Sequence, residues 1–102
     1  MGDREMLELA ARAAGIDGSF NPAGYIEYES DEGWTETFDP LTDDGDALRL
    51  AVKLNFTVRC YMGNTCVQST VPGGPSVMVD DADTRRAITR AAASIGVKLC
   101  HT

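Results

Sequence analysis

The sequence predicts a mixed α/β domain of the α+β type, sandwich-like, with a small and mainly antiparallel sheet packed with three helices in the order α-β-(β)-α-β-β-β-α. Three segments carry apolar residues at helical spacing, and short alternating segments bounded by turn residues lie between them. The length of 102 residues suits one compact domain over residues 1–102 and leaves no room for two.

The first helix is predicted over Asp3–Ala14, because polar and apolar residues separate onto two faces of a helix in this segment. Asp3 is the predicted N-cap, and Gly15 stands where a left-handed residue would end the helix. Turn chemistry at residues 21–24 then precedes a predicted hairpin of strands 25–29 and 34–38, with its turn at residues 31–33.

The clearest helix is predicted from about Asp43 to Leu54. Thr42 or Asp43 can cap its N-terminus, and acidic residues in the first turn match the positive end of the helix dipole. Apolar residues nearly encircle this helix, apart from a polar stripe of Arg49 and Lys53, which predicts a central position with contacts on more than one side.

A second hairpin is predicted from strands 57–62 and 65–71, joined by Gly63-Asn64 in a type II′ turn. One face of this hairpin is mainly apolar: Val58, Cys60, Met62, Val67, Ser69 and Val71. The opposite face is mainly polar: Arg59, Tyr61, Cys66, Gln68 and Thr70. This split predicts a sheet covered mainly on one side, with Cys60 in the core and unable to bond to Cys66.

After a loop at residues 72–75, a short strand is predicted over Ser76–Val79. The last helix is predicted to begin at Asp80 or Asp81 and to end at Ile95, with Gly96 as its left-handed residue. Its buried stripe contains Ile88, Ala91, Ala92 and Ile95, and its outward face carries Arg85, Arg86 and Arg90. Residues 97–102 are expected either to add a strand or to fray.

Two of these segments resemble a known family. Residues 38–54 (FDPLTDDGDALRLAVKL) and residues 84–96 (TRRAITRAAASIG) are similar to the corresponding runs of small tailed-phage and prophage proteins grouped as the phage ABA-sandwich domain family. The resemblance covers about the C-terminal two thirds of the chain. It implies helices on both faces of a small sheet, which the one-sided hairpin matches only if a short first helix covers part of the second face. The family has no assigned activity, so the resemblance implies no active site.

The formal net charge of −7 disfavours direct binding to nucleic acid or to anionic membranes. The three cysteines, Cys60, Cys66 and Cys100, are an odd number and do not make a disulfide framework. No apolar stretch approaches the length of about 18 residues needed to span a bilayer, and the N-terminal residues do not read as a signal peptide. We therefore expect a reducing cytosol.

The most unusual feature is an acidic segment, because no Lys or Arg occurs between Ala13 and Leu48. More than half of the acids of the chain lie there: Asp17, Glu27, Glu29, Asp31, Glu32, Glu36, Asp39, Asp43, Asp44 and Asp46. A negative surface of this kind would attract a basic partner and would bind it in a salt-sensitive way. The candidate partner-binding residues are Glu27, Glu29, Asp31, Glu32, Glu36, Asp39, Asp43 and Asp44. The alternative is a solvated hairpin followed by residues that cap a helix.

Other residues offer weaker signals for chemistry. Residues 40–51 lack the acids that an EF-hand loop needs at its first and twelfth positions, and the Cys and His spacing does not fit zinc. His101 adjoins Cys100, but sequence neighbours rarely face each other as a catalytic pair. Gly73-Gly74 lacks a phosphate-binding pattern. Trp34 could form an aromatic contact patch with Tyr25, Tyr28 and Phe38, but most of these aromatic residues are expected in the core. We expect no catalytic residue, metal or cofactor.

The predicted function is that of a non-enzymatic phage or prophage accessory protein in the cytoplasm of a bacterial host. It would bind a basic host protein through the acidic surface, for example to inhibit a defence protein or a nucleic-acid-binding protein. The alternative is a structural or assembly protein that self-associates, for instance as a homodimer.

Overall fold

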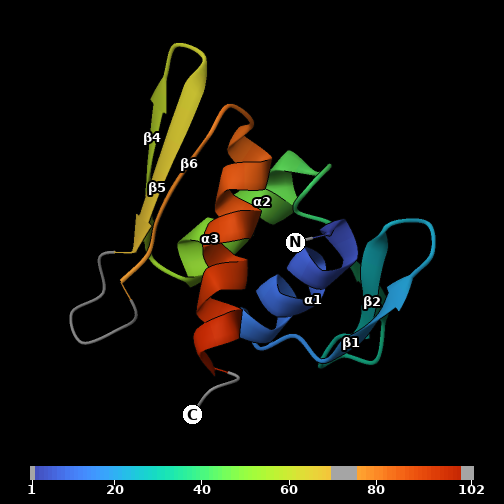
Figure 1. Ribbon diagram of the computed structural model, residues 1–102. Coiled ribbons are helices and arrows are strands. Elements are labelled where there is room, and N and C mark those ends of the chain that lie inside the picture. The colour runs from blue at the N-terminus through green and yellow to red at the C-terminus, as the bar shows by residue number, and fades with distance from the viewer. Residues whose placement is uncertain (1, 70–75, 100–102) are drawn as a thin grey trace.

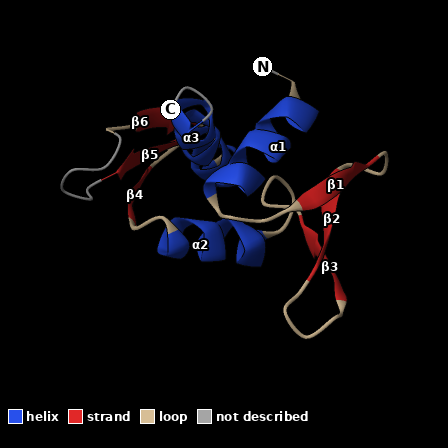
Figure 2. Ribbon diagram, turned by 90° about the horizontal axis from the view of Figure 1, so that it is seen from below, coloured by secondary structure: helices blue, strands red, loops and turns tan. Residues whose placement is uncertain are grey.

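The computed structural model describes residues 2–69 and 76–99. Within these ranges, three helices lie between two three-stranded antiparallel sheets (Figures 1 and 2). The elements follow the order α1 (Asp3–Ala13), β1 (Gly18–Asn21), β2 (Tyr25–Glu29), β3 (Thr35–Phe38), α2 (Asp44–Lys53), β4 (Phe56–Tyr61), β5 (Asn64–Ser69), β6 (Met78–Asp81) and α3 (Thr84–Leu99). The predicted fold class and element order are confirmed, although the strands form two sheets instead of one.

The first sheet has the order β1-β2-β3, and β1 is the strand that the sequence pattern did not predict. Its residues lack the alternation of polar and apolar side chains that is typical of a strand. The segment is a strand because it pairs with β2, with Gly18 opposite Tyr28 and Phe20 opposite Ile26. A Cβ atom on Gly18 would lie 2.4 Å from the carbonyl oxygen of Glu27. Glycine therefore lets β1 approach β2 at a place where any other residue would collide with the backbone.

Two predicted helix boundaries are wrong, and the close packing of α1 against α3 explains the first of them. Gly96, expected to end the last helix, lies inside α3, which continues to Leu99. A Cβ atom on Gly96 would lie 2.1 Å from the carbonyl oxygen of Leu9 in α1, so this glycine serves a close helix–helix approach. At the other end, Gly2 is the N-cap of α1 and Asp3 is its first helical residue, so the predicted Asp3 cap is wrong.

Helix α2 begins as predicted. The Asp43 side chain accepts hydrogen bonds from the backbone N–H groups of Gly45 (2.8 Å) and Asp46 (3.4 Å). Ala47, Leu50 and Ala51 are buried, whereas Leu48 and Val52 are 64% and 68% exposed. The helix therefore has one apolar flank in solvent and is less enclosed than its composition predicts.

The second sheet has the order β4-β5-β6, and its inner face is covered by helices while its outer face is largely open. The two-residue turn between β4 and β5 is Met62-Gly63, one residue earlier than predicted, with Gly63 at φ +77°. The register between β4 and β5 therefore differs from the predicted one by two residues, with Val58 opposite Val67. A shift of two residues leaves each side chain on its predicted face of the sheet. Cys60 and Cys66 are both free, as predicted.

Cys60 was expected in the core and is exposed. The β4–β5 hairpin extends beyond the helices, so the inner face near its tip has no cover (Figure 1). The end of the predicted strand at residues 70 and 71 and the loop at 72–75 lie outside the described residues, as do residues 100–102. Residues 97–99 continue α3 and form neither a strand nor a frayed end.

The predicted boundary between the last strand and the last helix lies a few residues too early. Asp80 and Asp81 belong to β6, opposite Cys66 and Thr65. Helix α3 instead begins at Thr84, after Asp83, whose side chain accepts a hydrogen bond from the backbone N–H of Arg86 (3.2 Å).

Candidate functional site

The structure divides the predicted acidic residues between the β2–β3 hairpin and the start of α2. On the hairpin, Glu27 and Glu29 lie on the outer face of the sheet, opposite Thr37 and Thr35. Glu36 lies opposite Tyr28, on the face that also carries Ile26 and the buried Phe38. These acids therefore surround the hairpin without sharing one face.

The acids near α2 are engaged within the protein. Asp43 caps the helix, and Asp44 forms a salt bridge with Arg85 of α3 (3.5 Å). The backbone N–H of Asp39 donates to the Asp46 carboxylate (2.9 Å), and the Asp39 carboxylate accepts from the Thr42 hydroxyl. Asp39, Asp43 and Asp44 thus anchor the segment before α2, which is the structural alternative raised for this part of the acidic segment.

The tip of the β2–β3 hairpin carries acids without an ion pair in the described part of the chain. Glu29, Asp31 and Glu32 are exposed, and none of their carboxylates forms a salt bridge with another described residue. Trp34 follows in the same turn and is 67% exposed, against the prediction that it belongs to the core. We call Glu29, Asp31, Glu32 and Trp34 the hairpin-tip surface.

The turn that presents this surface is well defined. The Ser30 N–H donates to the Trp34 carbonyl oxygen (2.8 Å), and the Gly33 N–H donates to the Ser30 carbonyl oxygen (2.9 Å). The Ser30 hydroxyl accepts from the Trp34 N–H (3.2 Å), and Gly33 adopts φ +87°, which favours glycine. The turn that places Trp34 at the surface is therefore closed by hydrogen bonds.

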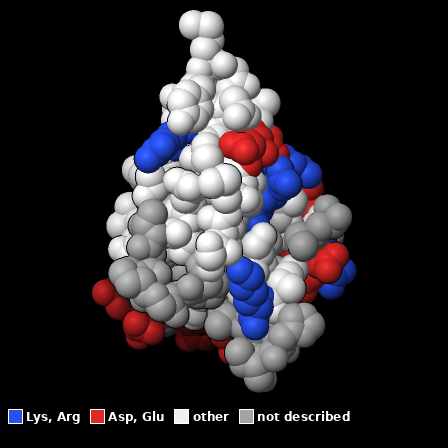
Figure 3. Space-filling model, turned by 60° about the vertical axis from the view of Figure 1, so that its left-hand side comes forward, with Lys and Arg blue, Asp and Glu red and all other residues white. Residues whose placement is uncertain are grey.

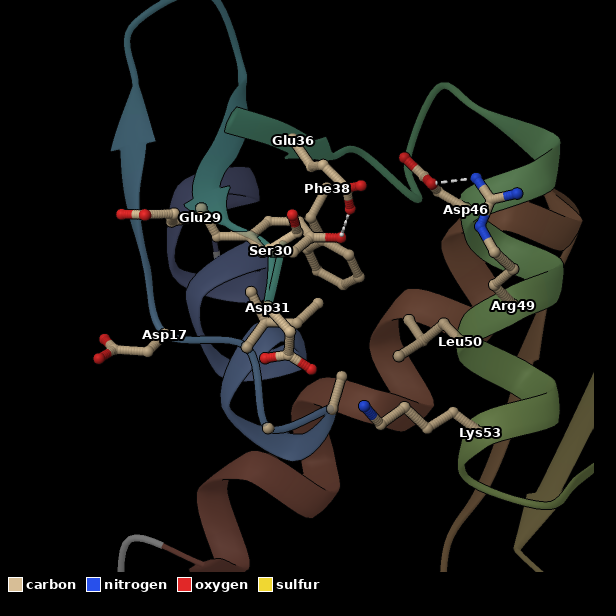
Figure 4. A pocket seen from close by; sticks show the side chains of 14 residues that line it. Asp17, Glu29, Ser30, Asp31, Glu36, Phe38, Asp46, Arg49, Leu50 and Lys53 are labelled. Carbon is tan, nitrogen blue, oxygen red and sulfur yellow. Dashed lines mark hydrogen bonds and ion pairs between the residues drawn. The ribbon is translucent and has the colours of Figure 1, made fainter. Parts of the chain in front are cut away.

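A cleft of about 550 Å³ separates this hairpin from α2 (Figure 4). Phe38 and Leu50 line its inner part, and Glu36 and Asp31 point into it from the hairpin side. Asp17 and Glu29 also line the cleft, but their carboxylates point away from its centre (Figure 4).

The opposite wall of the cleft is cationic and belongs to α2. Arg49 binds the Asp46 carboxylate (2.5 Å), and Lys53 extends across the cleft toward the hairpin (Figure 4). This is the polar stripe that the sequence predicted on α2. On the hairpin side the Tyr28 hydroxyl donates to Glu36 (2.8 Å), and this hydrogen bond raises the pKa of Tyr28 above its ordinary value. Glu29 and Asp31 belong both to the cleft lining and to the hairpin-tip surface, whereas the cations of the cleft lie on its α2 wall.

Sequence reasoning favoured the core for Trp34 over an aromatic contact patch, because aromatic side chains are usually buried in a domain with so few of them. The signal available was its place in Asp31-Glu32-Gly33-Trp34, directly after a turn glycine and two acids. A tryptophan inside a tight polar turn cannot easily reach the core.

The outward arginines of α3 already have partners within the protein. Arg85 binds Asp44 and donates to the Thr42 carbonyl oxygen (2.9 Å), and Arg90 binds Asp81 (3.0 Å). Arg86 lies 3.4 Å from Asp3 and 3.9 Å from Asp81. Such pairing agrees with a solvated structural face.

Other candidate chemistry finds little support in the part of the chain that the structure describes. It contains no group of three or more His, Cys, Asp or Glu placed to hold a metal ion. Burial and a hydrogen bond with Asp80 raise the pKa of the Cys66 thiol, which disfavours the reactive thiolate. Cys100, His101 and Gly73-Gly74 lie outside the described residues.

None of the helices in residues 2–69 and 76–99 is long and apolar enough to cross a membrane. Comparison with protein-family models, curated proteins and solved structures finds no match to this chain. The resemblance to the phage ABA-sandwich domain family therefore stays a prediction.

Proposed function

We propose that this chain is a non-enzymatic accessory protein of phage or prophage type that binds a basic protein in the cytoplasm of a bacterial host. The observation that carries the proposal is the hairpin-tip surface, in which an exposed tryptophan stands beside acids without an ion pair among the described residues. The acidic segment and the family resemblance in the sequence support the same setting.

The chemistry of this surface favours a protein partner with a basic patch around an apolar recess. Tryptophan is enriched among the residues that dominate binding energy, because its large ring loses much water contact when it enters a pocket. The surrounding carboxylates would attract Lys and Arg of the partner and would speed association at low salt. Proteins that bind nucleic acid carry basic surfaces, so the form of action we favour is inhibition of such a host protein, for example one that acts in defence, by occupying its basic surface.

The choice of variants follows from the contacts. The Asp39 carboxylate accepts from the Thr42 hydroxyl and the Asp44 carboxylate pairs with Arg85, so reversing their charge would break contacts within the protein as well as change the surface. Asp31 and Glu32 are exposed and unpaired among the described residues, and they can be replaced by Lys without breaking a recorded salt bridge.

The matched control is a double variant of α1. Glu5 and Glu8 are exposed on that helix, and the only salt bridge recorded for them is the exposed Arg4–Glu8 pair (3.2 Å). Each reversal changes the charge by two, so D31K/E32K and E5K/E8K both take the chain from −7 to −3. A difference between these variants therefore reports position and not net charge.

The experiment is affinity purification of the tagged protein from bacterial lysate at about 0.1 M and about 0.5 M salt, with mass spectrometry of the proteins that co-elute. We expect a basic protein that is retained at low salt and lost at high salt, because the Debye length falls from about 10 Å to a few ångströms over this range. Trp34→Ala and D31K/E32K should lose it, whereas E5K/E8K should retain it. A partner captured equally by all variants, or no basic partner at all, would contradict the proposal.

A further inference from the structure

The β4–β5 hairpin is almost free of charge in a strongly acidic chain. From Leu54 to Val79, Arg59 is the only charged residue. Figure 3 turns this side of the molecule toward the viewer and shows a broad area without charged groups that runs down from the tip of the hairpin. The acidic β2–β3 hairpin lies on the other side of the helices (Figures 1 and 2).

Strand β4 forms an open edge of its sheet. It pairs with β5 on one side, and its backbone makes no other recorded hydrogen bond with a described residue. The opposite edge of the same sheet, at β6, is covered by cationic side chains of α3. Arg90 donates to the Asp80 carbonyl oxygen (3.3 Å), and Lys98 donates to the Ser76 carbonyl oxygen (2.7 Å). Proteins commonly protect edge strands with charges, prolines or cover, and β4 has only Arg59.

Apolar side chains are exposed next to this open edge. Tyr61 is 58% exposed and Met62 is fully exposed at the tip, while Cys60 is exposed on the inner face of β4. Helix α2, which packs against β4, also has an exposed apolar flank at Leu48 and Val52. An unpaired strand beside such side chains is suited to receive another strand.

We propose that β4 pairs with β4 of a second copy of this chain, antiparallel about a twofold axis, so that two three-stranded sheets join into one. Two copies with a charge of −7 each repel one another, and this hairpin is the part of the described surface where they can meet with least repulsion. A second copy also brings an edge of the same length with the same exposed apolar side chains and Arg59 as its only charged residue, and a twofold interface requires such identical surfaces.

The register of the pair follows from its symmetry. Directly opposite residues of antiparallel strands lie on the same face of the sheet. The twofold axis therefore passes between the two copies of a single β4 residue, which lie opposite each other. An axis at Arg59 would place two like charges opposite each other, which is unfavourable. An axis at Val58 gives the longest overlap that avoids this, with Phe56 opposite Cys60 and Thr57 opposite Arg59.

The test combines association with amide exchange. Sedimentation and light scattering from about 1 μM to about 1 mM should detect a concentration-dependent dimer. Along β4 the backbone N–H groups point alternately toward β5 and away from it, and those of Phe56, Val58 and Cys60 point away. Hydrogen exchange at these three amides should therefore slow in the dimer. A monomer over the whole range, or protection confined to other elements, would overturn the proposal.

Two variants block the edge in different ways. Cys60→Pro removes an outward amide, which an edge strand tolerates, and Met62→Glu adds a like charge at the exposed tip without touching the backbone. Each should raise the dimer dissociation constant about tenfold or more, since the change is repeated by symmetry in both copies. Trp34→Ala should leave the constant unchanged, which separates this surface from the hairpin-tip surface. A dimer that tolerates both edge variants would also refute the pairing.

Discussion

Replacing Gly96 with Ala tests the packing that holds α1 against α3. The added Cβ would lie 2.1 Å from the carbonyl oxygen and 3.1 Å from the Cα atom of Leu9, whereas ordinary contacts begin at about 3.4 Å. The neighbouring atoms belong to helix backbone, so relief requires α1 to move by about 1 Å as a unit. This movement would loosen the contacts of Ala10 with the core.

The expected change in the free energy of unfolding of the Gly96→Ala variant can be estimated from two opposing effects. Overpacking a close contact costs about 1–3 kcal/mol, while exchanging Gly for Ala inside a helix stabilises it by up to about 1 kcal/mol. We expect the clash to prevail and to lower the free energy of unfolding by about 1–2 kcal/mol. For a domain of this size, that corresponds to a fall in Tm of about 5–15 °C.

The assay is thermal and urea unfolding followed by circular dichroism. Ser94→Ala in the same helix is the control, because it removes only a bond from the side chain to its own helix and should change stability by no more than about 0.5 kcal/mol. A Gly96→Ala variant as stable as the parent, or more stable, would refute the close approach of the two helices.

Three further predictions concern single residues. Asp43→Ala should lower the free energy of unfolding by about 1 kcal/mol in urea denaturation, because two N–H groups of α2 lose their cap. The N–H of Asp83 lowers the pKa of Asp81, so this carboxylate should stabilise the fold above about pH 4 and lose that effect as the pH falls through its lowered pKa; Asp81→Asn should flatten this part of the stability profile. Iodoacetamide labelling mapped by mass spectrometry should modify the exposed Cys60 faster than Cys66, whose thiol pKa is raised, and equal rates would count against the described environments.

Local signals in the sequence predicted much of the fold. The Asp43 cap and the left-handed Gly15 depend on nearby residues alone, and both are found in the structure. The faces of the β4–β5 hairpin were also predictable, because a shift of two residues in pairing leaves every side chain on its original face.

The parts that could not be predicted depend on distant contacts. A glycine near a helix end resembles a stop signal, and only the approach of Leu9 explains why α3 continues through Gly96. Strand β1 forms because it pairs with β2. Cys60 is exposed because the β4–β5 hairpin extends beyond the helices that cover the rest of its inner face (Figure 1). The residue pattern of one strand does not predict how far the neighbouring elements extend.

The candidate site shows the same division. The sequence located the acidic segment and the Asp43 cap, but it could not show that Asp44 is paired while the acids at the hairpin tip have no ion pair among the described residues. That distinction arises from Arg85, which lies far along the chain and reaches Asp44 only in the folded protein. The exposure of Trp34 likewise depends on the turn that Ser30 closes around it.

The most direct test of the hairpin-tip surface uses the fluorescence of Trp34, the only tryptophan in the chain. The basic protein captured from lysate would be titrated into this chain at about 0.1 M and about 0.5 M salt, with the emission of that partner alone subtracted. We predict a blue shift of the emission and weaker quenching by acrylamide at low salt, both reversed at high salt, because the indole moves from water into the interface. Saturable binding that leaves the Trp34 emission and its quenching unchanged would contradict the proposed surface.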